Sequence, residues 1–122
     1  LETNNYLISR YNYKGEFAYV FIDKETKKTS ISTFEWKKDS KQGIPNNFDC
    51  GLTFSPESYF VDVENEFLAG TIQPYLLKAY VASEAFKNST PKYPEKKKEL
   101  EKLANSLSEN DNPVLMLVKL KE

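Results

Sequence analysis

Residues 17–22 constrain the fold more than any other segment, because every one of them is aromatic or aliphatic. Alternate side chains of a β-strand point to opposite faces. The two faces of this strand would therefore carry Phe17, Tyr19 and Phe21 on one side and Ala18, Val20 and Ile22 on the other. An antiparallel sheet with one face in water has polar residues at alternate positions. The pattern predicts a strand that is covered on both faces.

This strand is the middle one of a three-stranded meander that we expect in residues 1–36. The polar turns NYKG and KETK separate three runs that are rich in aromatic and β-branched residues. Such spacing is typical of consecutive hairpins. The third run, KTSISTF, is rich in serine and threonine, and this polar composition suits an outer or edge strand.

A second sheet is expected from residues 48–73 and 113–122. We predict a short strand at 51–54, and an acidic turn divides two further strands at 59–63 and 66–73. The last strand, VLMLVKL, is again apolar on both faces and needs a neighbour on each side.

Residues 74–108 are expected to form a two-helix excursion before the last strand. Pro74 and Pro94 can each occupy the first turn of a helix, and apolar residues follow each of them at helical spacing. The two stripes are Leu76, Ala79, Tyr80 and Phe86, then Leu100, Leu103, Ala104 and Leu107. The fold class is therefore mainly β with two helices. The chain shows no βαβ alternation and no G-x-G-x-x-G motif, which argues against a nucleotide-binding α/β fold.

Composition narrows the possible functions. The 122 residues suit a single domain or a domain fragment. The net charge is -1 and no basic stripe exists, so nucleic acid is not an expected partner. The chain has no histidine, which excludes Ser-His-Asp and Cys-His catalysis and imidazole metal sites within it. Cys50 is the single cysteine, so no intrachain disulfide can form. No run approaches the ~20 apolar residues that a transmembrane helix requires.

Two local patterns suggest a family. In NNFDCGLTFSP, an acidic residue precedes a glycine, an aromatic residue and a proline; in ENDNPVLMLVKLK, Asn-Pro precedes an apolar strand. Together with YNYKGEFAYVFIDKETKKT, these pieces resemble the C-terminal part of a family of exported bacterial six-bladed β-propeller proteins, most of unknown function. The matching residues are Asp49, Gly51, Phe54, Pro56, Asn112 and Pro113, while Cys50 stands where the family often has glycine. The resemblance spans residues 6–121.

The resemblance implies antiparallel meander sheets that make up about two propeller blades, since one blade takes roughly 40–50 residues. Residues 5–34 would be strands of one blade, and 48–54, 66–73 and 113–121 would be strands of the last blade. The final strand would then pair with residues 66–73, and the outermost strand would be missing. An open edge favours association, so we expect either missing N-terminal blades or a homo-oligomer. The resemblance also implies an extracytoplasmic location, periplasmic or surface-anchored.

Three residues are candidate ligand contacts. The resemblance implies that Asp49 lies near the central channel of a propeller. The alternative is a carboxylate that caps a tight turn beside Gly51. Trp36 and Tyr93 lie in predicted loops, where exposed aromatic rings can stack on sugars.

A weaker candidate site consists of Asp62, Glu64 and Glu66, which alternate and would share one face of a strand. Clustered carboxylates can bind Ca²⁺ or act as an acid–base pair. The alternative is a solvated strand end at a turn. We predict no cofactor and no catalytic residue. Cys50 has no histidine to activate it, so we interpret it as a small, half-buried residue.

The sequence favours a non-catalytic binding or interaction module whose ligand is a small molecule, a glycan or a protein. The alternative is a fragment of a propeller-scaffold hydrolase or lyase that uses carboxylates. A fold alone does not separate these functions, since propellers support both, but the lack of histidine favours the first. A third interpretation is a self-contained small α+β domain.

Overall fold

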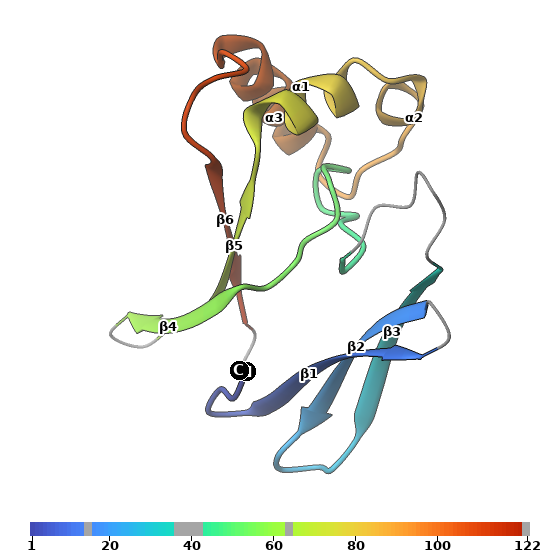
Figure 1. Ribbon diagram of the computed structural model, residues 1–122, viewed down its shortest axis with the longest axis vertical. Helices are drawn as coiled ribbons and strands as arrows, with labels where there is room; N and C mark the ends of the chain where they lie inside the picture. The colour runs from blue at the N-terminus through green and yellow to red at the C-terminus, as the bar shows by residue number, and fades with distance from the viewer. Residues whose placement is uncertain (14–15, 36–42, 63–64, 121–122) are drawn as a thin grey trace. The chain divides into compact units, whose positions relative to one another are not determined.

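The computed structural model describes residues 1–13, 16–35, 43–62 and 65–120. Over these ranges the structure is mainly β, as predicted, with two antiparallel three-stranded sheets and three helices (Figure 1). No helix within these ranges is long and apolar enough to span a membrane.

The first sheet is the predicted meander. Its strands are β1 (Tyr6–Tyr13), β2 (Glu16–Asp23) and β3 (Thr29–Glu35), in the order β1-β2-β3. In the central strand β2, Ala18 and Tyr19 are both buried although they point to opposite faces. The apolar pattern at 17–22 thus corresponds to a strand with two neighbours that is covered on both faces at this point.

The turn between β2 and β3 follows from its sequence. Asp23 Oδ1 accepts hydrogen bonds from the backbone N–H groups of Glu25 and Thr26, at 2.9 and 2.8 Å. These bonds, led by the one from Thr26, lower the pKa of Asp23. Lys27 then has a positive φ of 58°, which turns the chain back so that Asp23 N–H donates to the carbonyl of Lys28.

The second sheet contains β4 (Ser58–Asp62), β5 (Asn65–Ile72) and β6 (Val114–Lys119), in the order β4-β5-β6. The last strand pairs with β5, which confirms the expected pairing with residues 66–73. The other neighbour of β5 is β4, not residues 48–54.

The predicted strand at 51–54 is wrong. Only Phe54 pairs, through one isolated bridge to Ile44. Cys50 has a positive φ of 57°, and the N–H of Gly51 donates to the Asp49 side chain instead of to a neighbouring strand. The Asp49 side chain therefore accepts the Gly51 N–H that a strand would donate to a neighbouring strand.

The helical excursion lies between β5 and β6, as predicted, but it contains three helices: α1 (Pro74–Val81), α2 (Glu84–Lys87) and α3 (Pro94–Ser106). The first predicted helix is interrupted at Ser83. The backbone of Ser83 is extended, and its Oγ accepts the N–H of Phe86. This hydrogen bond caps the N-terminus of α2. An N-cap serine satisfies a donor that has no partner within the new helix. Pro74 and Pro94 each occupy the first turn of a helix, as expected.

The chain divides into two compact units. We call residues 1–44, 54–70 and 117–122 the sheet unit, and residues 45–53 and 71–116 the helical unit. The core of the helical unit is made by Leu77, Val81, Phe86 and Ala104. Lys78 closes the end of α3, because its Nζ donates to the carbonyls of Ala104 and Leu107 at 3.3 and 2.8 Å. The helical unit carries the candidate site.

Candidate functional site

The candidate site begins with the turn at residues 46–51. Asp49 Oδ1 accepts one hydrogen bond from the Asn46 side chain and one from the Gly51 N–H, each at 2.8 Å. A Cβ atom at Gly51 would lie 2.9 Å from Asp49 Oδ1 and 2.9 Å from Leu100 Cδ2. Only glycine fits this position without a shift of its neighbours. The Asp49 carboxylate thus has the geometry of the structural alternative, a turn cap beside Gly51.

Three hydrogen bonds hold this turn on the helical unit. The N–H groups of Lys92 and Tyr93 donate to the carbonyls of Asn47 and Phe48, at 2.9 and 3.0 Å. The phenol of Tyr80 donates to the carbonyl of Cys50 at 2.9 Å. Two segments that are distant in the sequence are therefore joined through their backbones, which limits how far the side chains between them can move.

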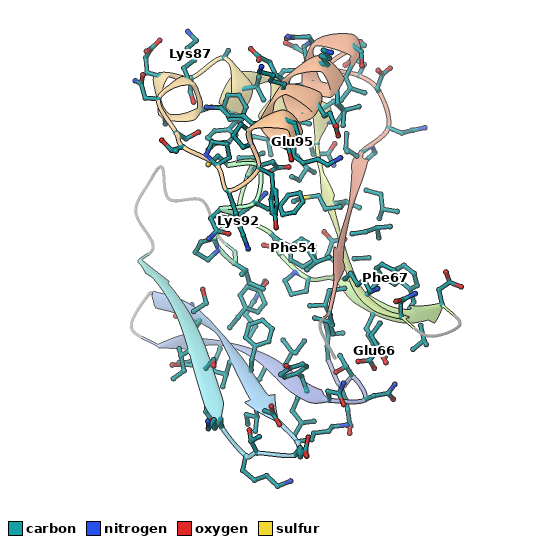
Figure 2. All side chains as sticks on the ribbon, turned by 180° about the vertical axis from the view of Figure 1, so that it is seen from behind. Phe54, Glu66, Phe67, Lys87, Lys92 and Glu95 are labelled. Atoms are coloured by element: carbon teal, nitrogen blue, oxygen red, sulfur yellow. The ribbon has the colours of Figure 1, made fainter. Side chains whose placement is uncertain are left out.

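The joined segments present an aromatic pair, Phe48 and Tyr93. The ring centres are 4.6 Å apart and the planes are tilted by 50°. The two residues remain 49% and 36% exposed, although aromatic rings usually pack inside. Lys92 places its ammonium 5.4 Å from the centre of the Tyr93 ring (Figure 2), a cation–π distance.

The carboxylate of Asp49, the residue that follows Phe48 in the turn, has one oxygen without a hydrogen bond from the described residues. Both hydrogen bonds that Asp49 accepts from the described residues end on Oδ1, so Oδ2 can accept a hydrogen bond from a ligand. Asp49 as a whole residue is partly buried. Burial, followed by the negative charges of Cys50 and Asp49, raises the pKa of the Tyr80 phenol. Tyr80 is therefore a protonated donor to the turn at neutral pH.

The predicted ligand contacts are brought together only in part. Asp49 follows Phe48 in the turn, and the Phe48 ring contacts the Tyr93 ring in a tilted arrangement. Trp36 lies outside the described residues. Sequence reasoning missed Phe48, whose available signal was an aromatic residue inside a polar segment. This pattern does not predict whether the Phe48 ring is exposed or buried.

The second set of carboxylates is arranged differently. Asp62 is exposed at the end of β4, and Glu64 lies outside the described residues. Glu66 Oε1 accepts the phenol of Tyr59 at 2.5 Å and the N–H of Asn4 at 2.7 Å (Figure 2). No group of three or more metal-binding His, Cys, Asp or Glu side chains occurs among the described residues. Glu66 therefore acts as a structural acceptor in the sheet unit.

Comparisons of the chain with protein-family models, with curated proteins and with solved structures found no match. Its function is therefore argued from the geometry of its own residues. Cys50, which the sequence analysis interprets as structural, is a free and half-buried cysteine whose carbonyl receives the Tyr80 hydrogen bond.

Proposed function

We propose that this chain is a non-catalytic binding module and that the aromatic pair Phe48–Tyr93 is its contact surface. The observation that carries the proposal is the exposure of two aromatic rings in contact, on segments whose backbones are hydrogen-bonded to each other. Ligand sites are lined mainly by aromatic and apolar groups, with a few polar groups that orient the ligand. Because the rings are held in place, binding costs little additional conformational entropy.

The ligand class that suits this surface best is a glycan. A sugar ring offers an apolar face, which stacks on an exposed aromatic ring, and hydroxyl groups, which donate hydrogen bonds. Asp49, which follows Phe48 in the same turn, offers Oδ2 as an acceptor. Lys92 adds a donor on the side of Tyr93. A neutral or weakly charged saccharide suits this surface, because the negative charge of Asp49 and the positive charge of Lys92 offset each other.

We also propose that the chain forms the C-terminal blades of an exported six-bladed β-propeller and acts outside the cytoplasm. Support comes from the three-stranded antiparallel meander β1-β2-β3, and from the pairing of the last strand with β5. The strand order β4-β5-β6 differs from the blade expected from the resemblance, in which residues 48–54 would be the innermost strand. The binding proposal does not depend on the propeller.

The experiment is a titration of the ¹⁵N-labelled chain with chitohexaose, cellohexaose and maltohexaose, followed by amide chemical shifts. At least one of these sugars is expected to shift the signals of residues 47–51 and 92–93. Tyr93→Ala should abolish the shifts. Tyr75→Ala is the matched control, because Tyr75 is an exposed tyrosine on α1, and it should bind as the unsubstituted chain does.

Two results would contradict the proposal. One is the absence of shifts with all three sugars, which rejects the glycan class. The other is cleavage of a bound sugar during the titration, seen as new anomeric proton signals, which rejects the non-catalytic role.

A further inference from the structure

The strand β6 ends the strand order of the second sheet, with β5 as its neighbour (Figure 1). Just after β6, the N–H of Leu120 donates to the carbonyl of Glu66 in β5 at 2.8 Å. Backbone groups alternate in direction along a strand. The N–H and C=O groups of Leu115, Leu117 and Lys119 therefore point away from β5.

The same residues carry exposed apolar side chains. Leu115 is 60% exposed and Leu117 is 50% exposed, and both lie on the face of the strand that also carries Lys119. Edge strands in soluble proteins are usually protected by charges, by proline or by a bulge. The first charge in β6 is Lys119, its last residue, so nothing in the described part of the chain protects most of this edge.

We propose that β6 pairs antiparallel with β6 of a second copy of this chain, around a two-fold axis at Leu117. Leu117 then faces Leu117 of the second copy, and Leu115 faces its Lys119. In such hydrogen-bonded pairs the two residues exchange both N–H···O bonds. The two sheets become one continuous sheet across the axis. This inference goes beyond the proposed binding function and does not depend on it. It is the alternative to the proposed propeller, in which a strand of the missing blades would cover the same edge.

Charge and register favour a second copy as the partner. The pairing places each Lys119 opposite Leu115 of the other copy. The aliphatic part of the lysine side chain can cover this leucine, and the two lysines stay apart. A register shifted to an axis at Met116 would place Lys119 opposite Pro113, which has no N–H to donate. The net charge of the chain is only -1, so two copies repel each other weakly.

The size of the contact sets the expected affinity. The strand has six residues, and interfaces below about 1,000 Å² are weak or transient. We expect a reversible dimer with a dissociation constant of about 10–500 µM. Sedimentation velocity of the full chain, from about 5 µM to about 1 mM, covers this range. The sedimentation coefficient should rise with concentration toward that of a dimer.

Substitutions at Leu117 test the pairing. Leu117→Pro removes an outward N–H, a position where an edge strand tolerates proline, and should leave a monomer. Leu117→Lys and Leu117→Glu should each be monomeric, because like charges would meet across the axis. An equimolar mixture of these two variants should dimerise again, because Leu117 faces its own copy only in this register. Leu76→Lys is the matched control, since Leu76 is 48% exposed on α1, and should dimerise normally.

Circular dichroism and thermal melting establish that each variant folds. If Leu117→Pro unfolds, the Lys and Glu variants and their mixture decide the question. A chain that stays monomeric at the highest concentration overturns the proposal and leaves the edge to a different partner. A closed trimer, or a dimer that persists in Leu117→Lys alone, also overturns it.

Discussion

The phenol of Tyr59 donates a 2.5 Å hydrogen bond to Glu66 Oε1, the oxygen that also accepts the N–H of Asn4. Tyr59 lies on β4 and Glu66 on β5, so one carboxylate oxygen connects two adjacent strands and the N-terminal segment. This hydrogen bond, then burial and the negative charge of Glu66, raise the pKa of Tyr59.

The raised pKa predicts a pH dependence of stability. The folded state favours the protonated phenol, so the contribution is fully present below the unfolded pKa of about 10 and is lost as the pH rises through the folded pKa. Tyr59→Phe should lower the melting temperature at pH 8, and its difference from the unsubstituted chain should shrink above about pH 10. Melting curves of both proteins across this range measure the effect. A difference that stays constant with pH would show that the phenol does not act through its proton.

The Tyr80 phenol is predicted to stabilise the turn that carries the candidate site. Tyr80→Phe removes the hydrogen bond to the Cys50 carbonyl but keeps the edge contact with Phe86. The free energy of unfolding should fall by about 0.5–1.5 kcal/mol, measured by urea denaturation. Tyr75→Phe, on the exposed side of α1, is the control and should change little. Equal effects of the two substitutions would contradict the assignment.

The core of the helical unit depends on Leu77, which is 1% exposed. Leu77→Ala should lower the free energy of unfolding by about 2–5 kcal/mol, because it leaves a cavity among Val81, Phe86 and Ala104. The neighbouring Leu76→Ala removes the same atoms from an exposed position and should cost less than about 1 kcal/mol. Chemical denaturation of both variants gives the comparison. Similar costs would mean that the core lies elsewhere.

A side chain at Gly51 is predicted to require its neighbours to move. Gly51→Ala places a methyl group 2.9 Å from Asp49 Oδ1 and Leu100 Cδ2, and because both atoms end side chains that can shift, it should cost about 1 kcal/mol, the lower end for overpacking. The amide signals of Phe48 and Tyr93 should move, because the turn shifts with them. Because Leu100 itself packs against the core, the test is made in a Leu100→Ala background, where Gly51→Ala should cost less since one of the two contacts is absent. A Gly51→Ala variant with unchanged stability would contradict the tight turn.

The elements that the sequence predicts best are those with a long periodic pattern. The unbroken apolar run at 17–22 predicts the central strand β2, and the change of period after Pro74 predicts the helical excursion. The interruption at Ser83 was missed, since helical spacing continues through it to Phe86. The Ser83 hydroxyl accepts the Phe86 N–H and begins a new helix. The spacing of apolar residues does not indicate such a hydrogen bond.

The candidate site was harder to predict. Asp49 and Tyr93 each stood out in the sequence, but nothing there indicated that Phe48 would join them. The strand expected at 51–54 failed for a related reason, because the Asp49 side chain competes for the backbone N–H of Gly51. Whether a side chain or a neighbouring strand accepts a backbone N–H depends on angles and distances, which the amino-acid composition does not determine.

The sequence by itself determined where most strands and helices form, because alternation and helical period reflect burial one residue at a time. It did not determine the buried face of α1, where Leu76 of the predicted stripe is 48% exposed and the neighbouring Leu77 is buried. Only the tertiary structure decided that β4 lies beside β5, that Glu66 accepts hydrogen bonds from Tyr59 and Asn4, and that the rings of Phe48 and Tyr93 are in contact. These contacts join segments that are distant in the chain. They depend on the sum of many weak contacts and on backbone hydrogen bonds, which no single residue type specifies.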